Sequence, residues 1–357
     1  MISISSPNIG SEEIKEASEV LLSGNLIQGG KVKEFENIFS KFIGVKYGIA
    51  TSSGTTALQV ALEAIGIKAG DEVITTPFSF IATSNAVLYQ KAKPIFADID
   101  PKTFNIKPEN IRKGIKKETK AVLVVHLYGH PCEMGEIKDI CERHNIILIE
   151  DCAQAIGAEY KKKKVGSFGD VSCFSFYPTK NITTGEGGMI LTNNKDVEYK
   201  SRAIRDHGKR NESHETLGYN FRLTEFQAAI GLVQMKKIDQ FNRKRDENSR
   251  ILSENIKNNR ITKPYVDPNV KHAWNQYTIR VSSRDDLSEF LNKSGIGTRI
   301  YYKKPIYAEP VYKRFGYKEV ICPEAEKASN QVLSLPIHPK LTQNEVLKVA
   351  EVVNKFV

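Results

Sequence analysis

The sequence of 357 residues contains no run of about 18 uninterrupted apolar residues, which a membrane-spanning helix would need. Residues 1–10 are also too few and too polar to form the apolar core of a secretory signal peptide. Hydrophobic residues make up 40% and charged residues 26%, as in an ordinary globular protein. We therefore expect a cytoplasmic protein that makes no contact with a membrane.

Cysteine is scarce and irregularly spaced. The five cysteines are an odd number and include no Cys-x-x-Cys pair; they are Cys132, Cys141, Cys152, Cys173 and Cys322. This pattern indicates neither a disulfide framework nor a zinc or iron–sulfur site, although ligands that only folding brings together stay open. We predict a protein without a metal site.

Acidic residues are outnumbered by basic ones, 42 to 52, which gives a formal net charge of +10. Such an excess suits nucleic acid, an anionic membrane surface or a small molecule that carries a diphosphate. However, the basic residues are dispersed, and no helix-turn-helix signal or basic region with interleaved aromatic residues stands out. We keep a regulatory DNA-binding protein as an alternative, but we predict no nucleic-acid partner.

Strand-like and helical patterns alternate over the first half of the chain. The strand-like segments are 47–50, 71–76, 92–98, 121–126 and 146–151, and helical patterns lie near 108–116 and 134–144. This alternation predicts an α/β fold with a parallel or mixed sheet that helices cover on both faces. A long helix is expected from Thr224 to about Ile256. We expect two domains, a large one of residues 1–245 and a smaller C-terminal one of residues 246–357.

Chemically useful side chains follow two of the apolar runs. Ile146–Glu150 is typical of a buried parallel strand and places Asp151 at its carboxyl end, where open α/β sheets bind ligands. A second β-rich run, Val171–Tyr177, ends at a proline, so Lys180 lies on a loop just beyond a strand end. Ser175 precedes the lysine by five residues. These groups match the needs of pyridoxal phosphate, because a lysine can form the Schiff base, a carboxylate can keep the pyridine nitrogen protonated and a hydroxyl can hold the phosphate.

An earlier turn of small residues is a candidate phosphate site. The turn joins a short strand to a helix that we expect to begin at Ala57. Gly54, Thr55 and Thr56 would present free backbone N–H groups at the positive end of the helix dipole. Serine and threonine are also ordinary helix N-caps, so the turn alone does not establish the site. Its place ahead of the lysine supports the phosphate interpretation.

Several separated motifs, in this order and spacing, make the chain resemble the DegT/DnrJ/StrS-type nucleotide-sugar aminotransferases, which are fold type I pyridoxal-phosphate enzymes. The resemblance extends from about Gly24 to the C-terminus. It implies a large domain with a mostly parallel seven-stranded sheet flanked by helices, and a smaller α+β domain. It also implies transfer of an amino group from an amino acid, L-glutamate, to a nucleotide-diphosphate keto-sugar, for surface polysaccharide or glycan biosynthesis. Pyridoxamine phosphate would be the intermediate form of the cofactor.

The resemblance also implies roles at the cofactor. Lys180 would bind the cofactor and then move a proton between the donor carbon and the cofactor, and Asp151 would pair with the ring nitrogen. Gln154 would donate a hydrogen bond to the phenolic oxygen, and Phe80 would stack on the ring. Ser175 would bind the phosphate together with the turn at Gly54, Thr55 and Thr56.

Further residues are implied at the subunit boundary and at the substrate. Asn220 corresponds to a residue that reaches the phosphate of the neighbouring subunit, which would make the protein a homodimer with shared sites. Residues in the substrate-contacting stretches of the family correspond to His207, Arg222, Tyr301 and Tyr302. Tyrosines and basic groups suit a diphosphate and sugar hydroxyls.

Two other kinds of enzyme are alternatives. A nucleotide-sugar 3-dehydratase would use the same cofactor, but in one branch a histidine replaces the lysine and in another an iron–sulfur cluster is bound. Lys180 speaks against the first branch and the scattered cysteines against the second. A fold type I enzyme that acts on amino acids alone would need an arginine clamp for the α-carboxylate, and no motif identifies one.

Overall fold

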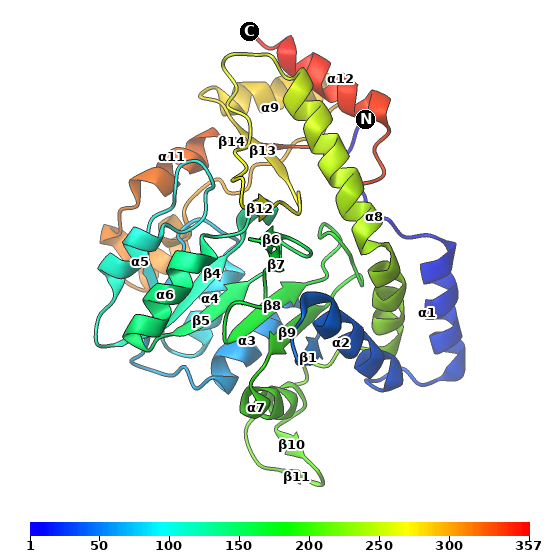
Figure 1. Ribbon diagram of the computed structural model, residues 1–357, viewed down its shortest axis with the longest axis vertical. Coiled ribbons are helices and arrows are strands. Elements are labelled where there is room, and N and C mark those ends of the chain that lie inside the picture. The colour runs from blue at the N-terminus through cyan, green and yellow to red at the C-terminus, as the bar shows by residue number, and fades with distance from the viewer.

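The computed structural model describes residues 1–357, and its centre is a seven-stranded sheet in the order β1-β9-β8-β5-β4-β2-β3 (Figure 1). The strands are β1 Tyr47–Thr51, β2 Glu72–Thr75, β3 Lys93–Phe96, β4 Thr119–Val125, β5 Ile147–Asp151, β8 Val171–Ser175 and β9 Gly188–Thr192. Strand β9 is antiparallel to its two neighbours, and all other neighbouring strands are parallel. The predicted mostly parallel seven-stranded sheet is confirmed.

Helices cover both faces of this sheet. They are α2 Gly30–Ile43, α3 Gly54–Ala64, α4 Ala82–Tyr89, α5 Pro108–Gly114, α6 Met134–His144, α7 Lys195–Arg205 and α8 Glu225–Asn255. Helix α1 Ser11–Ser23 packs against the outside of α8. Successive strand residues point to opposite faces. On β8, Cys173 joins the apolar cluster that contains α3, and the next residue, Phe174, joins the cluster that contains α2 and α8. The sheet is therefore buried on both sides, as its apolar strands predict.

The C-terminal part has its own core of 20 buried residues, which run from Leu252 to Val353 and include Ile2 from the other end of the chain. Its elements are β13 Tyr277–Arg280, β14 Val332–Leu335, α9 Arg284–Lys293 and α12 Gln343–Asn354. Helices α10 Pro310–Arg314 and α11 Pro323–Gln331 pack instead in an apolar cluster with Phe78 and Phe104. Figure 1 shows α8 running from the sheet to the C-terminal helices. The predicted boundary after residue 245 falls inside this helix, and the division into two domains stays a prediction.

Three short two-residue strands, β6 Glu159–Tyr160, β7 Lys163–Lys164 and β12 Val270–Lys271, form a small sheet. Another pair, β10 Lys209–Arg210 and β11 Ser213–His214, forms a hairpin that projects from the bottom of the view in Figure 1. Short 3₁₀ turns cover Leu127–Gly129, Ile306–Ala308 and Tyr317–Glu319. None of the helices combines the length and the apolar content that a membrane span needs.

The start of α3 corrects one expectation. The helix begins at Gly54 and not at Ala57, because Ser53 acts as its N-cap. The Ser53 hydroxyl accepts a hydrogen bond from Thr56 N–H at 3.1 Å, and Thr56 Oγ1 accepts one from Ser53 N–H at 2.9 Å. This reciprocal cap places Gly54 and Thr55 in the first helical turn, where backbone N–H groups have no partner within a helix.

Candidate functional site

A cavity of about 840 Å³ opens beside the last residues of β4, β5 and β8. It is lined by most of the residues that the sequence identified, namely Gly54, Thr55, Phe80, Asp151, Gln154, Ser175, Lys180, Tyr301 and Tyr302. The carboxyl ends of parallel strands meet at one edge of a sheet, so strand order explains why these separate motifs converge. Thr56, His207, Asn220 and Arg222 do not line this cavity.

One end of the cavity is suited to a phosphate. The N–H groups of Gly54 and Thr55 donate no hydrogen bond within the chain, and they lie at the positive end of α3. A Cβ atom at position 54 would lie 2.7 Å from Ser175 Cβ. Glycine therefore allows Ser175 to approach the helix N-terminus closely, and the serine hydroxyl joins the two free N–H groups as a third donor.

Asp151 is 4% exposed and is held by two donors. Its Oδ2 accepts a hydrogen bond from the Thr83 hydroxyl at 2.9 Å, and its Oδ1 accepts one from Ala153 N–H at 3.1 Å. Burial raises the pKa of Asp151, while these two hydrogen bonds and the charge of Lys180 oppose the shift. A cationic N–H inside the cavity would stabilise the carboxylate further, because opposite charges attract strongly in a buried site.

Lys180 follows a turn in which its N–H donates to Tyr177 C=O at 2.9 Å. Burial lowers the pKa of Lys180 to about 8, and the negative charge of Asp151 partly opposes this shift. A substantial fraction of the amine is therefore neutral near physiological pH, as a nucleophile or a base must be.

Gln154, Phe80 and Tyr302 line the same cavity. Gln154 Oε1 accepts from Tyr128 N–H at 2.9 Å, and its Nε2 donates to the Tyr302 hydroxyl at 3.0 Å, which leaves one amide hydrogen for a ligand. Phe80 is 57% exposed although it lines the cavity, so a face of its ring is available for stacking. Its ring centroid lies 6.4 Å from that of Tyr302.

Sequence reasoning missed several residues of the cavity. Thr83, in α4, donates a hydrogen bond to Asp151. Ile4 and Ser5, near the N-terminus, also line the cavity. Arg299 also lines it, two residues before Tyr301. Only Arg299 had a usable signal, since it lies in the same short stretch as the two predicted tyrosines.

Three of the four predicted residues that do not line the cavity lie around the base of the β10–β11 hairpin. Asp206 and Asn220 form an antiparallel bridge, and His207 N–H donates to Tyr219 C=O at 2.9 Å. Arg222 forms an ion pair with Asp206, with 2.7 Å between Nη1 and Oδ1. The predicted roles of Asn220, His207 and Arg222 stay predictions, because these residues gather at a place outside the cavity of their own chain.

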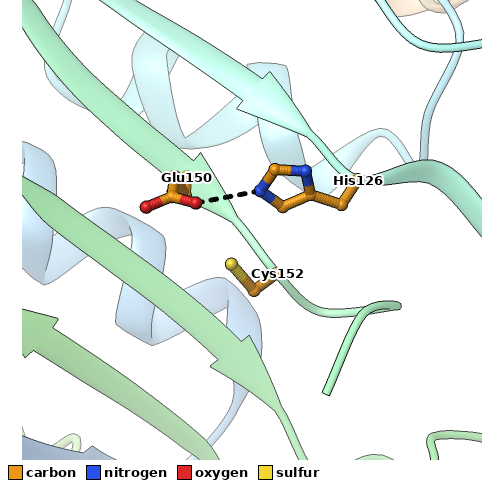
Figure 2. A group of neighbouring side chains, drawn as sticks. All are labelled: His126, Glu150 and Cys152. Carbon is orange, nitrogen blue, oxygen red and sulfur yellow. Dashed lines mark hydrogen bonds and ion pairs between the residues drawn. The ribbon is translucent and has the colours of Figure 1, made fainter. Parts of the chain in front are cut away.

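A buried cluster of His126, Glu150 and Cys152 lies at the carboxyl end of β5 (Figure 2). Their potential metal-ligating atoms lie within 4.8 Å of one another. However, His126 Nδ1 already accepts from Cys132 N–H at 3.0 Å, so the ring carries its proton on Nε2 and donates to Glu150 Oε2 at 3.1 Å.

Three backbone donors complete the coordination of the glutamate. The N–H groups of Gly166, Phe168 and Gly169 donate to the Glu150 carboxylate at 2.7–2.8 Å. Because successive strand residues alternate, Glu150 faces these donors while Asp151 faces the cavity. Hydrogen-bond donors thus occupy His126 Nδ1 and both carboxylate oxygens of Glu150, which are the atoms that a metal would need, and they fix the end of β5.

We expect Glu150→Ala to lower the free energy of unfolding by about 3 kcal/mol, because it leaves two buried and two partly buried donors without an acceptor. Denaturant unfolding measures this change. Glu142→Ala, which removes an exposed carboxylate from α6, should stay within about 0.5 kcal/mol of the wild type. A metal site would instead make the unfolding midpoint of the wild type fall on treatment with a chelator.

Comparison with known proteins gives matches along nearly the whole chain. The model of the DegT/DnrJ/EryC1/StrS aminotransferase family matches residues 7–354. GDP-perosamine synthase from Caulobacter vibrioides is 37% identical over 98% of this chain and 96% of its own length. The dTDP-3-amino-3,6-dideoxy-alpha-D-galactopyranose transaminase from Aneurinibacillus thermoaerophilus is 38% identical over 97% of this chain and 95% of its own.

A solved structure agrees with these sequence matches. The Streptococcus pneumoniae protein Spr1654, solved in its PLP form, superposes with a TM-score of 0.94. It is 26% identical in sequence, and the match covers 99% of this chain and 97% of that one. The similarity therefore includes the sheet, the C-terminal part and the cavity between strand ends.

Proposed function

The chain belongs to the DegT/DnrJ/EryC1/StrS aminotransferase family, and we propose that it transfers an amino group from L-glutamate to a keto group of a nucleotide-diphosphate sugar. Its cofactor is pyridoxal 5′-phosphate, which alternates with pyridoxamine 5′-phosphate during the two half-reactions. The observation that carries the proposal is the convergence of Lys180, Asp151 and the phosphate-binding turn at Gly54 in one cavity.

The residues of the cavity fit this cofactor. The free N–H groups of Gly54 and Thr55, with Ser175, would hold its phosphate, and the buried carboxylate of Asp151 would hold its protonated ring nitrogen. Phe80 offers an exposed ring face for stacking. When bound, the cofactor acts as an electron sink and stores the amino group between the half-reactions.

The chain's own groups then carry the proton. Lys180, in its neutral form, takes the proton from the α-carbon of the donor and returns it to the carbon that carries the amino group in the cofactor. Asp151 stays ionised when a cation lies beside it, and its charge holds the ring proton in place. The second amide hydrogen of Gln154 is free to donate to the phenolic oxygen of the cofactor. Because the amide is neutral, this hydrogen bond orients the ring without adding a charge to the site.

The lowered pKa of Lys180 predicts the pH dependence of cofactor capture. Only the neutral amine attacks an aldehyde, so the rate at which the apo-protein captures pyridoxal phosphate should rise with pH. The midpoint should lie near pH 8 and not near the ordinary value of 10.5. Stopped-flow absorbance measures this rate. Since the charge of Asp151 raises the lysine pKa, Asp151→Asn should move the midpoint to lower pH, and an unchanged midpoint would contradict the assigned contact.

Each site is proposed to include residues of a second subunit. Asn220, His207 and Arg222 lie together outside their own cavity, next to Leu217, an apolar side chain that is 85% exposed. Residues that contribute to no cavity of their own chain can complete the site of a second copy related by two-fold symmetry, as the family resemblance implies. We propose a homodimer in which Asn220 reaches the phosphate end of the neighbouring cavity, while His207 and Arg222 contact the substrate there.

Mixing of two inactive variants tests the shared site. In a heterodimer of Lys180→Ala and Asn220→Ala subunits, one of the two sites keeps both native residues. Random exchange should therefore restore roughly a quarter of wild-type activity, as expected for a two-fold symmetric dimer. Size-exclusion chromatography reports the assembly. A wild-type monomer with full activity would refute the shared site.

Glutamate as the donor and the cytoplasm as the location are parts of the same proposal. The five cysteines are buried free thiols, which fits a reducing compartment.

A 3-dehydratase is the second candidate, and it is disfavoured because Lys180 is present and partly buried with a lowered pKa, ready for proton transfer. The structure offers no specific support for the DNA-binding alternative, since the catalytic groups converge in one cavity.

The function is tested by loading the protein with pyridoxamine phosphate and adding keto-sugars linked to UDP, dTDP or GDP. Return of the visible absorbance of the lysine-bound cofactor identifies the acceptor, and analysis of the product shows whether C3 or C4 is aminated. If simple 2-oxo acids restore this absorbance efficiently and no nucleotide sugar does so, the protein is an amino-acid transaminase instead.

A further inference from the structure

Arg299 is the one arginine that lines the cavity, and it forms no ion pair or side-chain hydrogen bond within the chain. Its backbone is nevertheless fixed. Arg299 N–H donates to Ser334 C=O at 3.3 Å, and Ser334 N–H donates to Arg299 C=O at 2.8 Å. A rigid backbone therefore presents an unpaired guanidinium to the cavity. Glu186, an acidic residue that also lines the cavity, makes no ion pair with it.

Exposure falls along the segment from Arg299 to Tyr302, whose arginine and two tyrosines line the cavity. Arg299 is exposed, Tyr301 is partly buried, and the Tyr302 hydroxyl accepts from Gln154 in the wall next to Asp151. The positive charge of Arg299 also acts on Tyr301, whose pKa is raised by burial and lowered again by the arginine. Arg299 is thus the exposed end of this segment, and Tyr302 at its other end contacts Gln154, which lies close to Asp151 in the sequence and in the cavity.

The position of Arg299 indicates which anionic group it can bind, the α-carboxylate of the amino donor or the diphosphate of the acceptor. The α-carboxylate of an amino donor is bonded to the carbon that loses its proton, so it must lie close to Lys180. The diphosphate of a nucleotide sugar is separated from the reacting carbon by the sugar ring, so it must lie farther out. Guanidinium groups bind phosphates with two parallel hydrogen bonds. An exposed, unpaired arginine near the opening fits the outer anion.

We propose that Arg299 binds the diphosphate of the nucleotide sugar and thereby selects nucleotide-linked acceptors over free sugars. The inference rests on the proposed function, and it names a contact for the acceptor within the same subunit. The predicted diphosphate contact Arg222 is paired with Asp206 outside this cavity, so the two arginines would act from different subunits.

The test uses the intact holoenzyme and three variants. Arg299→Gln removes the charge, Arg299→Lys keeps the charge without the two parallel donors, and Arg260→Gln is the control. Arg260 is likewise exposed and unpaired, but it does not line the cavity. The probes are GDP, UDP and dTDP. Their binding is titrated by calorimetry, and each is also added as a competitor of the nucleotide sugar while the absorbance of the bound cofactor is followed. The glutamate half-reaction is measured separately by loss of the visible absorbance of the bound cofactor.

We expect at least one nucleoside diphosphate to bind the wild type, Arg299→Gln to weaken it by about tenfold or more, and Arg299→Lys to recover part of the loss. The glutamate half-reaction and the control should stay unchanged. The proposal is overturned if none of the three diphosphates binds the wild type or if Arg299→Gln binds them normally. It is also overturned if the variant loses the glutamate half-reaction instead, since Arg299 would then hold the donor carboxylate. Failure of the wild type to react with any amino acid would overturn the proposed function itself.

Discussion

Lys180→Ala is expected to lower kcat by at least about 10⁴-fold, because it removes both the covalent attachment and the base that moves the proton. The protein should keep its fold and still bind pyridoxal phosphate through the groups around Gly54 and Asp151. Visible absorbance of the lysine-bound cofactor should disappear. Borohydride reduction followed by peptide mass analysis should mark Lys180 in the wild type and no lysine in the variant.

Lys304→Ala is the matched control, since Lys304 is exposed and does not line the cavity. It should retain wild-type kcat and absorbance. Transamination by Lys180→Ala at the wild-type rate would show that another group carries the proton, and the assigned site would be wrong.

Asp151→Asn should have the second largest effect. The substitution keeps the shape of the side chain but removes the charge that would hold the ring proton. Loss of one partner of a buried ion pair costs about 3–5 kcal/mol. At about 1.36 kcal/mol per decade, kcat should fall by about 10²–10⁴-fold. Steady-state kinetics and single-turnover absorbance with glutamate measure the loss.

Thr83→Val provides a graded comparison for Asp151. It removes one of the two donors to the carboxylate, which should raise the pKa of Asp151 because the hydrogen bond favours the charged form. Loss of one such bond is worth about 1.5–3 kcal/mol, so kcat should fall by about tenfold or more and by less than in Asp151→Asn. Equal activities of Asp151→Asn and the wild type would contradict the role of this carboxylate.

The sequence predicted those parts of the site that depend on local patterns. An apolar run that ends in Asp151 and a β-rich run followed by Lys180 place both residues at strand ends, and parallel strand order then brings them together. The first residue of α3 was harder to predict, because the Ser53 cap makes Gly54 and Thr55 the first residues of the helix. A glycine and two threonines give a weak helix signal, and only the reciprocal cap decides where the helix begins.

Contacts between distant segments could not be predicted. Thr83 reaches Asp151 across 68 positions of sequence, and Ile4 and Ser5 join the cavity from the N-terminus. Their contacts follow from the packing of α4 and of the first residues against the C-terminal part, for which hydrophobic periodicity gives no register. Asn220 illustrates a further limit of local patterns, because the proposed partner of this side chain belongs to another subunit.

Transfer of labelled nitrogen tests the central claim most directly. The purified protein, with pyridoxal phosphate, is given L-glutamate labelled with heavy nitrogen at the amino group and the nucleotide-linked keto-sugar found by the absorbance screen. We predict that mass spectrometry will find the label in the nucleotide-linked amino sugar and that 2-oxoglutarate will form in equal amount. Label that stays in glutamate or moves only into other amino acids, with the keto-sugar unchanged, would contradict the account.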